Sequence, residues 1–168
     1  MKGALKMVDR MHSESEQENH HKAILDGYDV AEQVGHLIRR AHQRHTAIFQ
    51  QYSCDSNLTP MQFSVLCSVL DQGPSSLTDI VKRTAIDQAT IRGVVKRLKD
   101  RGLIKLISDP ADNRKVIVCV TADGEQLIQQ MIPLAREITD KTLEKLDMSE
   151  RIALKYLLRK IGGQSQAD

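Results

Sequence analysis

The sequence predicts a mainly α-helical fold with one small β-hairpin. Apolar residues recur at the spacing of amphipathic helices from about residue 28 to residue 161. Two short β-rich runs, 103–107 and 115–120, stand close together and are joined by a charged segment that contains a proline. The 168 residues are 40% hydrophobic and 27% charged, and no apolar run approaches the roughly 20 residues of a membrane helix. We therefore expect a globular protein without a membrane segment.

The N-terminal part divides into an arm and a helix. Residues 1–22 are polar, show no apolar period and are expected to form a mobile arm. From Tyr28 to Tyr52 the apolar side chains fall on one stripe of a helix, and the polar turn residues of 53–58 end it. We assign residues 23–58 to a dimerisation region, as its N-terminal helix.

Residues 59–120 are expected to form a compact domain. Thr59 is a good N-cap for its first helix. A second, short helix is capped by Ser75 or Ser76, and Gly102 ends the third helix as a left-handed C-cap. The expected elements are helices over 60–71, 77–83 and 88–101 and strands over 103–107 and 115–120.

Two further helices are expected after this domain. Thr121 caps a long amphipathic helix that reaches about Leu146, and Pro133 is expected to kink this helix without ending it. Ser149 is the expected cap of the last helix. The assigned regions are C-terminal dimerisation helices over 121–163 and a frayed tail over 164–168.

The order of these elements is typical of a winged helix-turn-helix domain. A helix of about four turns fits the major groove of DNA, and a hairpin behind it reaches the flanking minor groove or backbone. Between Lys82 and Lys105, eight basic residues stand against two acidic ones, which is the electrostatic footprint of a nucleic-acid-binding protein. A solvated helix face is the alternative explanation of this basic block.

The helix over 88–101 is the expected recognition helix. Its apolar face contains Ile91, Val94, Val95 and Leu98. The opposite face is basic, has small residues near its N-terminal half, and contains no Glu that could pair with a Lys. The residues expected to contact double-stranded DNA are Ser76, Thr78, Gln88, Ala89, Thr90, Arg92, Gly93, Lys96, Arg97, Asp112 and Arg114.

Three segments of the sequence resemble the MarR family of bacterial transcription regulators. They are Leu77-Thr78-Asp79-Ile80, the run 87–98 with the following Arg101-Gly102-Leu103-Ile104, and the wing Asp109-Pro110-Ala111-Asp112-Asn113-Arg114-Lys115. The resemblance covers about residues 28–162. It implies a homodimeric repressor whose outer helices form the dimer and whose winged domains bind a pseudo-palindromic operator. Gly93 stands where many relatives have a basic residue and Lys96 where many have Asp, so the operator sequence does not follow from the resemblance.

In the wing, the resemblance implies that Arg114 reaches DNA and that Asp112 orients it. A salt bridge that only stiffens the hairpin is the alternative. An exposed pair contributes only about 0–1 kcal/mol to stability, so its purely structural value would be small.

The size of the predicted winged domain also favours a dimer. A core of about 60 residues buries only a marginal fraction of its surface. The helices at both ends of the chain carry apolar stripes that need a partner surface. A two-fold dimer would match the two half-sites of a DNA operator.

The first helix contains a polar ladder. His36, Arg39, His42 and His45 recur every three residues. The resemblance places effector sites between this helix, the start of the second and the long helix, which adds Phe63 and Cys67. The run 37–44 is similar to members that sense small aromatic acids, so we expect a hydroxylated benzoate or pyridine carboxylate as effector. Arg39 would hold the carboxylate and His45 a polar ring substituent. The alternative is that His45 is a core histidine hydrogen-bonded within the protein.

Other classes of protein are less well supported. The sequence lacks the Gly-rich phosphate loop, Gly-x-Ser-x-Gly and HExxH motifs of enzymes, and we expect no cofactor. A metal sensor is an alternative, but His20 and His21 are the only close pair of ligands. A thiol sensor would use Cys54, because Cys67 and Cys119 are typical of buried small hydrophobes. The odd, scattered cysteines indicate a reducing cytoplasm, and a protein that binds no DNA is the remaining class.

Overall fold

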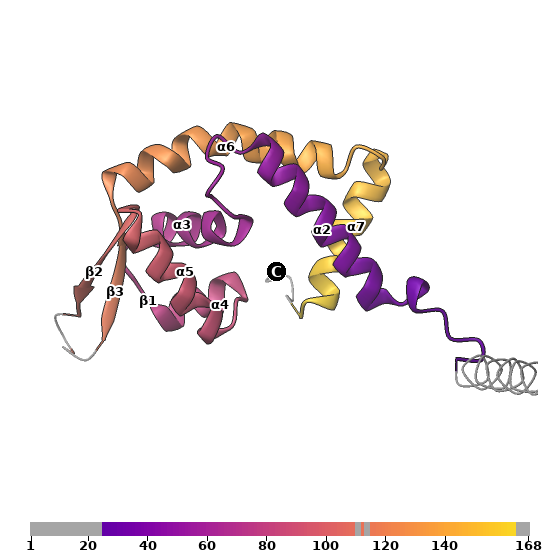
Figure 1. The fold of residues 1–168 in the computed structure, drawn as a ribbon, viewed down its shortest axis with the longest axis horizontal. Helices are drawn as coiled ribbons and strands as arrows, with labels where there is room; N and C mark the ends of the chain where they lie inside the picture. The colour runs from indigo at the N-terminus through magenta and orange to yellow at the C-terminus, as the bar shows by residue number, and fades with distance from the viewer. Residues whose placement is uncertain (1–24, 110–111, 113–114, 164–168) are drawn as a thin grey trace, which may run out of the picture. The chain divides into compact units, whose positions relative to one another are not determined.

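The computed structural model describes residues 25–109, 112 and 115–163 (Figure 1). The predicted arm over 1–22 and tail over 164–168 lie outside the described residues. The chain divides into two compact units, residues 1–42 and 43–168, which are described separately here. The assignment of regions to dimerisation and DNA binding stays a prediction.

The first unit contains a 3-10 turn, η1 (Val30–Glu32), and the beginning of helix α2 (Val34–Tyr52). The sequence predicted one helix from Tyr28, which is wrong for its first turn. The Asp29 carboxylate accepts the Ala31 N–H at 2.8 Å and caps the start of η1, and Gln33 follows η1 with an extended backbone. The local cap therefore prevents the helix from starting before Val34.

The second unit holds the rest of α2 and all later elements. These are α3 (Pro60–Gln72), β1 (Ser75–Ser76), α4 (Leu77–Thr84), α5 (Gln88–Asp100), β2 (Ile104–Ser108), β3 (Val116–Val120), α6 (Ala122–Thr142) and α7 (Met148–Ile161). The winged helix-turn-helix order is therefore confirmed, and Figure 1 shows α3, α4 and α5 grouped beside the hairpin.

The sheet has three antiparallel strands in the order β1-β3-β2, where the sequence predicted a hairpin alone. The unexpected strand, β1, pairs Ser75 with Val118 and Ser76 with Ile117. Two serines carry no alternating apolar pattern, so a strand of this length has no sequence signal. Its pairing fixes the start of α4 to the base of the wing.

The core of this unit lies where the three helices of the winged domain meet the sheet and α6. Its fully buried side chains include Leu58, Leu66, Ile80, Ile91, Leu98, Val118 and Met131. Gly124, in the first turn of α6, lies so close to the chain at Leu103 that a Cβ would overlap the Leu103 carbonyl oxygen. Gly102 has φ +73°, as the predicted left-handed cap requires.

The C-terminal helices begin and end at positions different from those predicted. α6 runs through Pro133 but ends at Thr142, four residues before Leu146. α7 is capped by Asp147 and not by Ser149. The Asp147 carboxylate accepts the Glu150 N–H at 2.9 Å, and the Glu150 carboxylate accepts the Asp147 N–H at 2.9 Å. This reciprocal pair satisfies two N–H groups that a cap at Ser149 would leave open.

Candidate functional site

Helix α5 presents a basic face to solvent. Its apolar residues Ile91, Val94, Val95 and Leu98 are all buried, as predicted. The residues expected on the opposite face divide into the exposed Gln88, Ala89, Arg92, Lys96 and Arg97 and the half-buried Thr90 and Gly93. At Gly93 a Cβ would approach only the Arg97 guanidinium, at 3.5 Å. The backbone of α5 is therefore accessible from this side.

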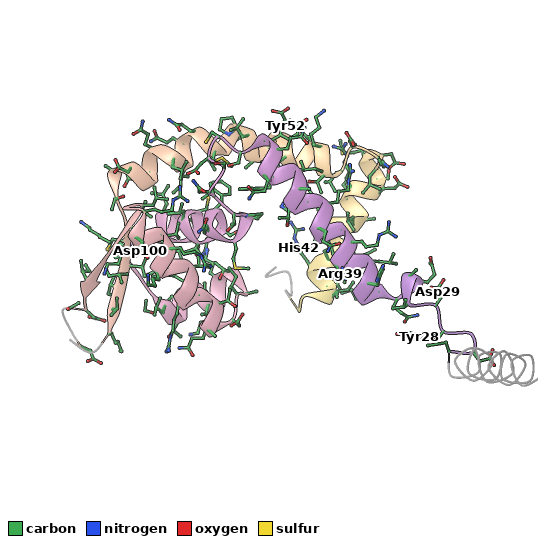
Figure 2. The ribbon with its side chains drawn as sticks, viewed as in Figure 1. Tyr28, Asp29, Arg39, His42, Tyr52 and Asp100 are labelled. Atoms are coloured by element: carbon green, nitrogen blue, oxygen red, sulfur yellow. The ribbon has the colours of Figure 1, made fainter. Side chains whose placement is uncertain are left out.

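Two charged side chains on this helix form an ion pair with each other that was not predicted from the sequence. The Lys96 ammonium lies 2.6 Å from the Asp100 carboxylate, one turn further along the helix, and Figure 2 labels Asp100 at its end. Both side chains are exposed, so the pair leaves the lysine available to an anion. Asp100 therefore takes the pairing role that a Glu would have in a helix without Glu.

The start of α5 is held by Asp87. Its carboxylate accepts the Thr90 N–H at 2.9 Å. Hydrogen bonds from the side chain and backbone of Thr90 hold the pKa of the Asp87 carboxyl below its usual range. Thr90, predicted to contact DNA, therefore also serves the cap in this structure.

A groove of about 610 Å³ runs between the starts of α4 and α5 and the base of the wing. It brings together three predicted residues, Ser76, Thr78 and Gln88, with Lys115 and Asp109. The Ser76 hydroxyl donates to the Asp79 carboxylate at 2.6 Å, which lowers the pKa of Asp79. Lys115 is a candidate cation of this groove that sequence reasoning passed over, although it directly follows the wing arginine.

In the wing, Asp112 is half-buried, and its carboxylate lies 4.0 Å from the Lys115 ammonium. Arg114 lies outside the described residues, so the predicted pairing of Asp112 with Arg114 stays a prediction. The observed partner of Asp112 is a second cation at the base of the wing.

The predicted effector residues of the first unit lie on α2. The Arg39 guanidinium lies 3.4 Å from His36 Nδ1, and His42 is exposed one turn along the helix. Figure 2 labels Arg39 and His42 on this helix. Neither Arg39 nor His42 is buried, so both are available to a ligand.

His45, in the second unit, has an internal partner. Its Nδ1 lies 3.1 Å from the Thr142 hydroxyl, which itself donates to the Ile138 carbonyl at 2.7 Å. Because that hydroxyl has only one proton, His45 donates through Nδ1. The alternative expectation, a core histidine hydrogen-bonded within the protein, therefore agrees with the contact of Nδ1. The histidine as a whole is only half-buried.

The other two predicted effector residues of this unit have different surroundings. The Phe63 ring packs against Phe49 with ring centres 6.1 Å apart. Cys67 lines a cavity of about 710 Å³ between α3, α4 and α6. Burial raises the pKa of the Cys67 thiol, which favours its uncharged form. Cys119 is buried, as predicted, whereas Cys67 is only partly buried, because its side chain faces this cavity, and Cys54 is exposed.

The lining of this cavity combines apolar and charged side chains. Cys67, Leu70, Ile128 and Ile132 provide apolar lining, of which Ile128 is buried and Leu70 and Ile132 are exposed. In the same lining, the Arg83 guanidinium pairs with the Asp71 carboxylate. Its volume lies in the range of small-molecule sites.

Two negative observations concern the described part of the chain. Among the described residues, no three His, Cys, Asp or Glu side chains gather closely enough to hold a metal ion. In the same residues, no helix combines the length and apolar character needed to cross a membrane.

Comparisons with known proteins agree with this architecture. Residues 56–115 match the MarR family. The HTH-type transcriptional repressor NicR of Pseudomonas putida is 57% identical over 134 residues, which cover 80% of this chain and 85% of that protein.

Two solved structures are similar in fold. One concerns Bordetella bronchiseptica BpsR, whose DNA binding is regulated by 6-hydroxynicotinic acid. It has a TM-score of 0.76 and 56% identity and covers 84% of this chain and 99% of its own. The other is a variant of Escherichia coli MarR complexed with operator DNA. It has a TM-score of 0.71 and 25% identity and covers 79% of this chain and 98% of its own. With its winged domain and these relatives, the chain belongs to the MarR family of transcriptional regulators.

Proposed function

We propose that this protein is a transcriptional repressor that binds a pseudo-palindromic operator as a homodimer and is released from it by a small aromatic acid. The observation that carries the proposal is the basic outer face of α5, whose inner face is fully buried. A regulator of this kind acts without catalysis and works in the bacterial cytoplasm, where its operator is.

The DNA contact would use the exposed part of α5 and the groove beside it. Arg92 and Arg97 provide cations that suit phosphates or guanine edges, and Gln88 provides a neutral hydrogen-bonding group at the helix start. Ala89 and Gly93 are small enough to let the helix approach base edges. The phosphate backbone of the DNA would be contacted by Ser76, Thr78 and Lys115, and by Arg114 in the wing.

The dimer contact would use the C-terminal helix. α7 has no buried residue in the single chain, yet it carries large apolar side chains. Those that are at least half exposed are Met148, Ile152, Tyr156, Leu157 and Ile161. A contiguous apolar face of this kind indicates a protein interface. A second copy of the chain would cover it and would space two winged domains for two half-sites.

The effector we propose is a hydroxypyridine carboxylate. The regulation of BpsR by 6-hydroxynicotinic acid supports this class, as does the 57% identity to NicR. The ligand has a carboxylate, a ring and a polar ring substituent. His36, Arg39, His42, His45, Phe63 and Cys67 are the residues predicted from the sequence to recognise these groups.

Fluorescence anisotropy with an operator selected from random duplex DNA tests this function. The protein should bind the selected duplex and dissociate when 6-hydroxynicotinic acid is added. Arg92→Ala should weaken binding, whereas Arg136→Ala, which removes an exposed cation of α6, should not. Equal binding of selected and random duplexes would contradict an operator-specific function.

A further inference from the structure

We propose that the cavity between α3, α4 and α6 binds the carboxylate of the aromatic effector through Arg83, which exchanges its partner Asp71 for the ligand. This inference rests on the proposed function and deepens it. It assigns the anion contact to a residue on α4, where the sequence predicted Arg39 on α2.

The lining of the cavity matches the chemistry of an aromatic acid. Ile128 and Ile132 of α6 and Leu70 and Cys67 of α3 offer an apolar surface for a ring. Because burial raises the pKa of Cys67, its uncharged thiol adds no negative charge beside the ligand. Arg83 is the cation of the lining, and a guanidinium matches a carboxylate with two parallel hydrogen bonds.

The present partner of Arg83 is easily displaced. The side chains of Arg83 and Asp71 are 46% and 63% exposed. An exposed ion pair of this kind changes an equilibrium constant by at most about fivefold. A ligand carboxylate can make the same contact while its ring leaves water for the apolar side chains of the lining, a gain that Asp71 cannot offer.

The place of Arg83 also connects the cavity to DNA binding. Arg83 lies in the last turn of α4, whose C-cap Ala85 is two residues before the N-cap of α5. Figure 1 shows α4 leading into α5 beneath α3. A ligand that draws Arg83 towards α6 would therefore act on the helix that precedes the recognition helix.

The exchange makes a distinctive prediction for the two halves of the ion pair. Arg83→Gln should weaken binding of 6-hydroxynicotinic acid by roughly five- to tenfold, because the contact of a half-exposed guanidinium with a carboxylate is partly screened by water. Asp71→Asn should strengthen it by about two- to fivefold, because the competing carboxylate is gone. A pair that only stabilises the fold would change binding in the same direction in both variants.

Isothermal titration calorimetry of the full chain without DNA measures these affinities. Arg44→Gln is the matched control, because Arg44 forms a similarly exposed pair with Glu144, at 44% and 49%, outside the cavity. It should bind the acid as the wild type does. The uncharged 6-hydroxynicotinamide should bind wild type and Arg83→Gln within about twofold of each other. Should Arg83→Gln fail to fold, as circular dichroism would show, Arg83→Lys keeps the charge and should lose only part of the affinity.

Two outcomes would overturn the assignment while the proposed function stands: wild-type affinity in Arg83→Gln, or equal weakening in both variants of the pair. Loss of binding in Arg39→Gln with Arg83→Gln unaffected would return the carboxylate to α2. If the wild type itself shows no binding, the effector class of the proposed function fails, and this occupant of the cavity fails with it.

Discussion

An ion pair at the end of the recognition helix should contribute more to stability than the exposed pairs do. Arg101 follows α5, and its guanidinium pairs with the Asp55 carboxylate in the turn between α2 and α3. It also donates to the Asn57 carbonyl at 3.2 Å. The two side chains are only 27% and 20% exposed. Water therefore screens this pair less than it screens Arg44 and Glu144, at 44% and 49%.

The magnitude follows from what each substitution leaves behind. Arg101→Met removes a charge-assisted bond and a second bond to a carbonyl, and it leaves the Asp55 carboxylate partly buried without its cation. We expect a loss of about 2 kcal/mol in the free energy of unfolding. Arg44→Met should lose only about 0.5 kcal/mol, the usual contribution of an exposed pair.

Urea unfolding followed by circular dichroism measures the difference. Both variants must be compared with the wild type at one protein concentration, because dimerisation would make stability depend on concentration. A double-mutant cycle with Asp55→Asn should recover most of the Arg101 loss as a coupling energy. Equal losses in Arg101→Met and Arg44→Met would refute the reasoning from burial.

Three further predictions concern the exposed face of α7, two glycines and the cap of α5. Ile152→Asp, on the exposed apolar face of α7, should shift the protein to a monomer in light scattering and abolish operator binding. Gly124→Ala should cost about 2–3 kcal/mol because its Cβ would overlap the Leu103 carbonyl. Gly93→Ala should instead stabilise α5 by about 0.5–1 kcal/mol in urea unfolding, because its Cβ would make only an ordinary contact with the Arg97 guanidinium. The pKa of Asp87 is lowered in the folded state, so its contribution to the free energy of unfolding is complete above about pH 4. That contribution is lost as pH falls through the pKa of the folded state. Asp87→Asn should therefore make stability fall less steeply with pH in acid unfolding curves.

Local capping signals made most of the fold predictable. Thr59 and Ser76 cap α3 and α4 as expected, because each accepts an N–H three residues ahead. The same rule explains the error at α7, where Ser149 was the expected cap and Asp147 is the observed one. Only Asp147 has a Glu at the third position to complete the box, and this distinction was available from the sequence.

The parts that were not predictable depend on residues distant in the chain. β1 exists because β3 provides partners for two serines that have no strand pattern of their own. The cavity beside Arg83 arises from three helices, and its Asp71 partner lies twelve residues away on another helix. No periodicity within one helix brings these two side chains together. Sequence reasoning instead favoured Arg39, whose neighbours recur visibly along a single helix.

The contacts around α4 and α5 divide the winged domain into a fixed part and an adjustable one. α5 is held at its start by Asp87 and at its end by the half-buried Arg101, whose partner lies in the α2–α3 turn. The last turn of α4 contains Arg83, whose pair with Asp71 is exposed and weak. A ligand therefore has to break weaker side-chain contacts to move the end of α4 than to move either end of α5. If the effector acts through Arg83, the Arg101 variants should lose stability but keep the ratio of operator affinities with and without the acid.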